Sequence, residues 1–138
     1  MTCILETFAT LRIFSGDLSP EAIEKKFGVK ATSSHNRDPK SRYRSHRDSN
    51  RWSWCTEQSV DSLDTLCHIN RVIEEFNDKA LELEALRSMG CTTDICSYMV
   101  TTGQGGPQLN LQTMRSLCCL GLTIWWDVYK GEEEDYKT

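Results

Sequence analysis

Four segments of the chain alternate between side chains of opposite character or are rich in β-branched and aromatic residues, and this pattern predicts strands. The segments are TFATLRIFSG (7–16), RWSWCTEQ (51–58), CTTDICSYMV (91–100) and LTIWWDVY (122–129). Successive side chains of a strand point to opposite faces of its sheet. The neighbours Trp125 and Trp126 therefore lie on opposite faces, and one of them leaves the face that helices cover.

Apolar residues spaced three or four apart predict three helices between these strands. The first helix spans residues 19–28 and opens on a serine N-cap. The second and longest spans residues 61–90, with Asp61 as its cap and a bend or break expected at Asn77–Asp78. The third spans residues 110–121, from an asparagine cap to a terminal glycine.

The predicted elements thus alternate strictly between strand and helix, and the first and last of them are strands. A length of 138 residues suits one domain, so residues 1–138 are interpreted as a single α+β domain. The segments around the first and third helices share one plan of strand end, glycine, cap, helix and glycine, which indicates a loose internal repeat. We therefore predict a four-stranded, mostly antiparallel sheet with helices on one face, either ferredoxin-like or a duplicated split βαβ unit.

Charge is unevenly distributed. Residues 30–51 form a polar basic loop with seven basic and two acidic residues, a net charge of +5, whereas the whole chain carries −4. Arg42, Tyr43 and Arg44 interleave basic and aromatic side chains within the loop, a combination typical of nucleic-acid or anion binding. The alternative is a solvated loop whose arginines pair with the acidic remainder. The tail, residues 130–138, is acidic and expected in solvent.

Seven cysteines, an odd number without any Cys-x-x-Cys pair, favour buried reduced thiols over disulfides. Cys91 and Cys96 with a histidine make a weak zinc candidate, because their spacing does not match known zinc sites, and we expect no metal. No apolar run is long enough to span a membrane, and the first residues lack the pattern of a secretory signal. These features favour a cytoplasmic protein with no membrane partner.

The segment TTGQGGPQLN (101–110) joins a predicted strand to a predicted helix and contains Gly103, Gly105 and Gly106. It lacks the Lys-Ser/Thr of a P-loop and the Gly-x-Gly-x-x-Gly spacing, and Pro107 removes one backbone donor. The favoured interpretation is a corner in which glycines allow positive φ angles. A partner contact and a phosphate cradle stay open as alternatives.

Candidate catalytic residues are few. His35 and His46 fall in the basic loop, and His68 lies beside the apolar stripe of the longest helix, where a partly exposed position is expected. Asp17 and Asp127 are carboxylates near strand ends, but nothing in the sequence brings them together as an acid/base pair. No motif of a serine hydrolase, kinase or metalloprotease occurs. We therefore expect a protein that is not an enzyme and needs no cofactor.

Four stretches of the chain resemble a known protein family. They are SGDLSPEAI (15–23), the strand WSW (52–54), GQGGPQLNLQTM (103–114) and LGLTIWWDVY (120–129). Together they are similar to the bacterial domain-of-unknown-function family 4279, and the resemblance covers about residues 8–129. It implies a small bacterial cytosolic protein with a matching fold, and it implies no reaction and no cofactor.

These observations favour a small binding protein, above all an immunity or inhibitor protein that neutralises a toxin. The acidic remainder of the chain would complement a basic toxin and speed association, and exposed aromatic residues would anchor it. The alternative function is nucleic-acid or anion binding by the loop 30–51. The candidate partner-binding residues are Arg42, Tyr43, Arg44, Trp52, Gly103, Gly105, Gly106, Trp125, Trp126 and Asp127.

Overall fold

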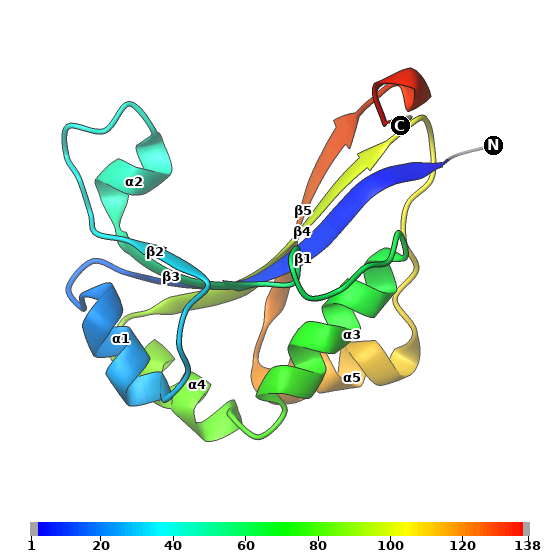
Figure 1. Ribbon diagram of the computed structural model, residues 1–138. Helices are drawn as coiled ribbons and strands as arrows, with labels where there is room; N and C mark the ends of the chain where they lie inside the picture. The colour runs from blue at the N-terminus through cyan, green and yellow to red at the C-terminus, as the bar shows by residue number, and fades with distance from the viewer. Residues whose placement is uncertain (1–2, 137–138) are drawn as a thin grey trace.

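The computed structural model describes residues 3–136 and contains one five-stranded sheet (Figure 1). Its strands lie in the order β2-β3-β1-β4-β5. Neighbouring strands are antiparallel, except that β4 and β5 are parallel. The sheet is therefore mixed. The strands are β1 (Ile4–Ser15), β2 (Ser33–His35), β3 (Asn50–Cys55), β4 (Thr92–Thr101) and β5 (Thr123–Lys130).

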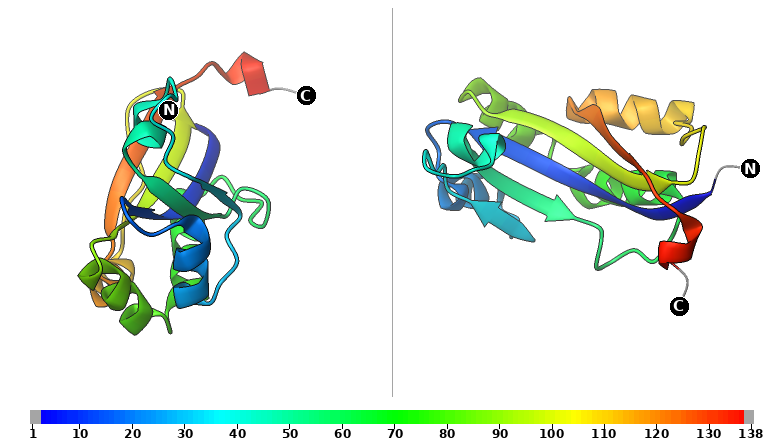
Figure 2. Two further views of the ribbon diagram at one scale, coloured as in Figure 1. Left: turned by 90° about the vertical axis from the view of Figure 1, so that its left-hand side faces the viewer. Right: turned by 90° about the horizontal axis from the view of Figure 1, so that it is seen from above.

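Four helices cover one face of this sheet, and no helical layer of the described residues covers the other face (Figures 1 and 2). The covering helices are α1 (Pro20–Phe27), α3 (Thr65–Phe76), α4 (Ala80–Ser88) and α5 (Leu111–Leu120). The short α2 (Arg44–Asp48) and the 3-10 helix η1 (Glu133–Tyr136) stand on the opposite side, at the two ends of the sheet. The fold is thus α+β with its main helices on one face, as the sequence predicts.

The predicted helix boundaries are confirmed where capping residues define them. The Ser19 side chain accepts a hydrogen bond from the Ala22 backbone N–H at the start of α1. The Asn110 side chain likewise accepts from the Thr113 N–H at the start of α5. Both helices end on a glycine with positive φ, 80° at Gly28 and 68° at Gly121.

The long predicted helix is two helices, α3 and α4, separated at residues 77–79. The expected break at Asn77–Asp78 is therefore confirmed, but the expected cap is wrong. Asp64 caps α3, because its carboxylate accepts a hydrogen bond from the Leu66 backbone N–H at 3.0 Å. Asp61 lies in the irregular segment before it.

The core fills the space between the sheet and the four covering helices. Its centre is aromatic, with Trp52 of β3 edge-on to Phe27 of α1 and to Phe76 of α3. Burial of these large side chains contributes favourable apolar transfer free energy at this end of the sheet. The fully buried aliphatic side chains that surround them are Leu11, Ile13, Ile23, Ile69, Val72, Leu83 and Ile95.

Two features of the fold differ from the predicted architecture. The basic loop contains a fifth strand and a helix, β2 and α2, which the sequence analysis missed because this segment has no apolar periodicity. The predicted internal duplication is also not reproduced in the sheet. The first unit places β1 and β3 antiparallel, whereas the second places β4 and β5 parallel, so only the local strand–cap–helix plan repeats.

Two expectations about burial are corrected. Most cysteines are not buried. Cys91 is buried, Cys55 and Cys96 are half-buried, and the other four cysteines are exposed. They therefore add little to the core. His68, expected at the surface, is completely enclosed. Its Nδ1 lies 2.6 Å from the Thr56 hydroxyl and its Nε2 lies 2.8 Å from the Ser62 carbonyl oxygen, so hydrogen bonds satisfy the buried ring.

Candidate functional site: the uncovered face of the sheet

The uncovered face of the sheet is the side of the strands opposite the helical layer. In β1, Ala9, Leu11 and Ile13 face the helices and are fully buried, so the intervening Thr10 and Arg12 point to the uncovered face. Residues paired across neighbouring strands share a face. Thr10 is paired with Cys55 and Cys96, and Cys96 with Trp125. One row of uncovered side chains thus crosses four strands.

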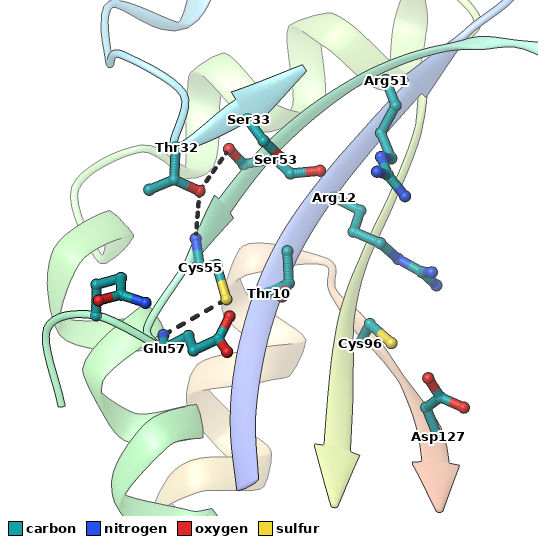
Figure 3. Close-up of a pocket in the computed structure, with 11 residues that line it drawn as sticks. Thr10, Arg12, Thr32, Ser33, Arg51, Ser53, Cys55, Glu57, Cys96 and Asp127 are labelled. Carbon is teal, nitrogen blue, oxygen red and sulfur yellow. Dashed lines mark hydrogen bonds between the residues drawn. The ribbon is translucent and has the colours of Figure 1, made fainter. Parts of the chain in front are cut away.

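A pocket of about 430 Å³ lies on this face and spans β1, β3, β4 and β5 (Figure 3). We call it the arginine pocket, because Arg12 and Arg51 extend into it from neighbouring strands. Its size falls within the range of small-molecule sites. The residues that line it are Thr10, Arg12, Thr32, Ser33, Arg51, Ser53, Cys55, Glu57, Gln58, Cys96 and Asp127.

The Arg12 guanidinium is held by Asp94 across the β1–β4 pair. Arg12 Nε donates to Asp94 Oδ1 at 2.8 Å and Arg12 Nη2 donates to Oδ2 at 2.6 Å, a bidentate ion pair. Burial opposes the charge of Arg12, but the hydrogen bond and the charge of Asp94 outweigh it, so the pKa of Arg12 is raised. Arg12 is therefore a fixed, locally neutralised cation.

Arg51 differs from Arg12 because no ion pair or side-chain hydrogen bond of Arg51 is found in the described part of the chain. Its Nε is buried without a partner. Burial, and then the nearby charge of Arg12, lower the pKa of Arg51. Ser53, two residues along β3 on the same face, is 2 % exposed, and its hydroxyl oxygen also lacks a partner. Within residues 3–136, the pocket thus contains a cation without a counter-charge and a hydroxyl without a partner.

The rest of the pocket is weakly polar or acidic. Burial, and the charges of Asp127 and Asp94, raise the pKa of the Cys96 thiol, so this cysteine is kept protonated and is a poor nucleophile. Cys55 and Thr10 lie beside it in the same row. Glu57 and Asp127 supply carboxylates at the end of the pocket away from Arg51 (Figure 3).

The β5 edge is a second feature of the sheet, at its last strand. β5 is the last strand of the sheet, so its outer backbone groups have no neighbouring strand within the described residues. Four of its large side chains are 41–61 % exposed: Trp125, Trp126, Val128 and Tyr129. We define these four as the β5 edge. On the uncovered face, Tyr129 contacts two further aromatic side chains in sequence. The ring centroids of Tyr129 and Tyr98 are 5.6 Å apart, and those of Tyr98 and Phe8 are 4.5 Å apart.

A basic lobe, residues 36–49, rises at the other end of the uncovered face (Figure 1). Its α2 is joined to the sheet by His46, which stacks on His35 of β2 with ring centroids 4.0 Å apart. Arg42 lies 4.9 Å from the Tyr43 ring centroid in a cation–π contact. Arg44 is strongly exposed and forms a loose 3.6 Å ion pair with Asp48.

The model of a known family, described as "Domain of unknown function (DUF4279)", matches residues 5–131. The chain belongs to the DUF4279 family. The match spans nearly the whole chain, so it includes both the arginine pocket and the β5 edge of this DUF4279 domain. No curated protein and no solved structure shows significant similarity to the chain.

The DUF4279 domain places three of the predicted contact residues on its last strand, β5. Trp125 and Asp127 point to the uncovered face. Trp126 points to the helical side but is exposed and lies outside the core. The expectation that one tryptophan leaves the helix-covered face is confirmed. Arg42, Tyr43 and Arg44 lie apart from them, in the basic lobe.

One predicted contact residue is wrong. Trp52 is fully buried in the core and cannot touch a partner in this fold. The alternation in β3 had the correct period, but it places Trp52 and Trp54 toward the helices and leaves Arg51 and Ser53 on the uncovered face. The sequence analysis missed Arg51 and Ser53 as site residues for that reason. Arg12, a charge between the apolar residues Leu11 and Ile13, was a signal that could have found this face.

The glycine loop, residues 102–110, lies beyond the end of β4 and has no regular structure. Gly103, Gly105 and Gly106 are exposed, and Gly105 has a φ of 108°, so the predicted corner with a positive-φ glycine is confirmed. The cap of α5 is supplied by Asn110 of the same chain, which occupies one of the amides that a bound phosphate would use. The geometry therefore favours a structural corner.

Two further observations concern metals and membranes. No cluster of three histidine, cysteine or acidic side chains suited to a metal ion occurs within residues 3–136. Among the helices that the structure describes, none is long and apolar enough to cross a membrane.

Proposed function

We propose that this DUF4279 domain is a non-enzymatic cytoplasmic protein that binds a protein partner through its β5 edge, as an immunity or inhibitor protein binds a toxin. The exposure of the β5 edge is the observation that supports this best. Large exposed apolar side chains that gather at one place on a protein surface mark interaction sites, and these four gather along one edge strand, on its two faces. Tryptophan and tyrosine are also the residues most enriched at energetically important positions of interfaces.

The position of β5 in the sheet supports the same proposal. An unpaired edge strand offers free backbone N–H and C=O groups, and proteins usually protect such edges with charges, proline or a covering loop. Within β5, the charged residues are Asp127, which lies between Trp125 and Tyr129 on the uncovered face, and the terminal Lys130. The strand contains no proline, so a single charge within it protects this edge. A partner strand or loop that pairs with β5 would satisfy these groups and bury the aromatic row at once.

Charge indicates what kind of protein this partner is. The chain carries −4, and η1 places Glu133, Glu134 and Asp135 just beyond the end of β5 (Figure 1). A basic protein surface complements this end of the molecule, and the attraction would accelerate encounter. We therefore infer a basic protein, such as a nuclease toxin, as the partner.

The basic lobe supports a second candidate function, the binding of nucleic acid or another polyanion. The Tyr43 ring is 52 % exposed and has Arg42 on it, so it offers a platform on which a base could stack. Against this stands the net charge of −4, which repels a polyanion at long range. The lobe is therefore the weaker candidate.

Affinity capture from the source lysate with three forms of the protein tests the proposal. The forms are the wild type, Trp125→Ala at the β5 edge, and Leu81→Ala as a matched control. Leu81 is 78 % exposed on α4, on the opposite side of the sheet, so its removal costs a similar apolar surface elsewhere. We expect one stoichiometric basic protein to bind the wild type and Leu81→Ala, to survive high salt, and to be lost with Trp125→Ala.

The activity of the captured protein then decides whether the interaction is inhibitory. Toxicity or nuclease activity that falls on addition of the wild type, and recovers with Trp125→Ala, supports an inhibitor. Retention of the same partner by Trp125→Ala would contradict the β5 edge as the interface. Nucleic acid that elutes at high salt, without a protein, would favour the basic lobe. Self-association of the purified chain through Trp125 would identify a second copy as the occupant.

A further inference from the structure

Arg51 is a half-buried cation without a counter-charge among residues 3–136. A half-buried guanidinium usually has a carboxylate partner, because removal of a charge from water is costly unless a counter-charge offsets it. Arg12, one strand away, has this partner in Asp94. Arg51 has none among residues 3–136, and its Nε is buried and unpaired. This end of the arginine pocket therefore suits an anion.

Ser53 is an independent observation that points to the same place. Its side chain is almost completely buried, lines the pocket, and has a hydroxyl oxygen with no hydrogen-bond partner. The neighbouring hydroxyl of Thr32 is already used, since it donates to the Ser53 carbonyl oxygen and accepts from the Cys55 backbone N–H. Buried hydroxyl groups normally have a partner. A ligand oxygen between Arg51 and Ser53 would satisfy both residues.

We propose that the arginine pocket binds a carboxylate group between Arg51 and Ser53. A guanidinium matches a carboxylate with two parallel hydrogen bonds, and a serine hydroxyl adds a third donor to the same oxygens. The source of the carboxylate is either a small free acid or an acidic side chain of a partner protein, since both offer the same group. This proposal does not depend on the β5 edge, because neither Arg51 nor Ser53 belongs to it.

The remaining charges of the pocket explain why a carboxylate fits better than a phosphate. Arg12 is neutralised by Asp94, so Arg51 supplies a single free positive charge. Glu57 and Asp127 line the rest of the pocket and repel a second negative charge on the ligand. A monoanion balances Arg51, whereas a dianion does not. Thr10, Cys55 and Cys96 offer a methyl group and two cysteine side chains to a short aliphatic part of the ligand.

The arginine Nε–Hε signals in NMR spectra of the intact chain test this proposal. The protein is titrated at constant ionic strength and chloride with acetate, butanoate, the α-amide of N-acetylglutamate, and inorganic phosphate. We expect the carboxylates to shift the Arg51 signal saturably and phosphate to bind about tenfold more weakly. A much higher affinity for butanoate than for the α-amide of N-acetylglutamate would indicate that the ligand is a small free acid. Similar affinities would indicate a partner's side chain.

Three variants accompany the titration. Arg51→Met removes the unpaired charge, so we expect it to abolish carboxylate binding while the melting temperature rises or stays unchanged. Ser53→Ala removes one hydrogen bond and should weaken binding about fivefold. Arg115→Gln, an exposed arginine of α5 on the opposite side of the sheet, is the matched control and should bind as the wild type does.

Three outcomes would overturn the proposal. They are the absence of any carboxylate-dependent shift at Arg51, phosphate binding tighter than every carboxylate, and carboxylate binding that survives in Arg51→Met. None of these bears on the captured protein partner, whose loss is measured with Trp125→Ala. The two proposals therefore fail separately.

Discussion

Arg12 and Asp94 face each other across β1 and β4 on the uncovered side of the sheet, joined by two hydrogen bonds of 2.8 and 2.6 Å. Each side chain is only 20 % exposed. This pair holds the Arg12 guanidinium at the wall of the arginine pocket, whereas Arg51 has no counter-charge among residues 3–136. The uncovered face is therefore a polar surface fixed by cross-strand pairing, with an apolar edge at β5.

The Arg12–Asp94 pair should stabilise the fold as well as shape the pocket. Asp94→Asn removes the charge of the acceptor and leaves the Arg12 charge without compensation. We expect the free energy of unfolding to fall by about 2 kcal/mol, because hydrogen bonds to charged, largely buried groups are stronger than neutral ones. Urea denaturation measures this. Asp48→Asn, which breaks the exposed pair with Arg44, is the control and should cost less than about 0.5 kcal/mol.

Truncation of Trp52 and of Trp125 should change the stability of the fold to very different extents. Trp52→Ala opens a cavity in the aromatic centre of the core and should cost about 3–5 kcal/mol of stability. Trp125→Ala removes a side chain that is 61 % exposed and should change stability by no more than about 0.5 kcal/mol. Thermal or urea unfolding compares them. A large loss of stability in Trp125→Ala would mean that this side chain serves the fold.

Thr56 connects β1 to the segment before α3 through His68. The Thr56 hydroxyl accepts from the Ala9 backbone N–H at 3.0 Å and lies 2.6 Å from His68 Nδ1. Since the Ser62 carbonyl can only accept, His68 Nε2 carries the proton and Nδ1 accepts from Thr56. Thr56→Val should cost about 2 kcal/mol of unfolding free energy, because it leaves buried groups unpaired. Thr56→Ser keeps the hydroxyl and should lose less; an equal loss would contradict this role.

His35 should make the basic lobe sensitive to acid. Burial, the charge of Arg51 and the neighbouring His46 lower the pKa of His35 below 6.5. The unfolded chain therefore takes up a proton at this site before the folded chain does. Stability should fall as the pH drops below about 6.5, and this loss should level off once the folded pKa is passed.

The difference in unfolding free energy between the wild type and His35→Asn, measured from pH 8 to pH 5, isolates this effect. We expect the wild type to lose more stability than the variant over the acidic half of this range. A wild type that gains stability relative to His35→Asn on acidification would show that His35 is stabilised in its charged form, contrary to its surroundings.

The sequence predicted those parts of the fold that depend on local chemistry. Caps such as Ser19 and Asn110 and the terminal glycines Gly28 and Gly121 determine helix ends through contacts within a few residues. The four main strands were visible for a similar reason, since alternation reflects one buried face. β2 was not predicted, because its residues Ser33–His35 carry no apolar pattern. The strand pairs along one edge of β3 and buries little side-chain surface.

The candidate site was only partly predictable, because it is formed by register between distant strands. Arg12 and Asp94 are far apart in the sequence, and Arg51 comes beside Arg12 only when β3 pairs with β1. Period-two alternation shows that Trp52 and Ser53 face opposite sides, but it does not show which side the helices cover. The sequence predicted that either Trp125 or Trp126 leaves the helix-covered face, because either orientation of β5 has this result.

Hydrogen exchange of the chain, free and bound to its captured partner, tests the central claim most directly. Backbone amides on the outer edge of β5 have no neighbouring strand within residues 3–136 and should exchange rapidly in the free protein. If the partner binds the β5 edge, amides of residues 123–130 should become protected, while those of α1 and α4 should not change. Protection confined to the covering helices or to the basic lobe, with β5 unchanged, would contradict the account.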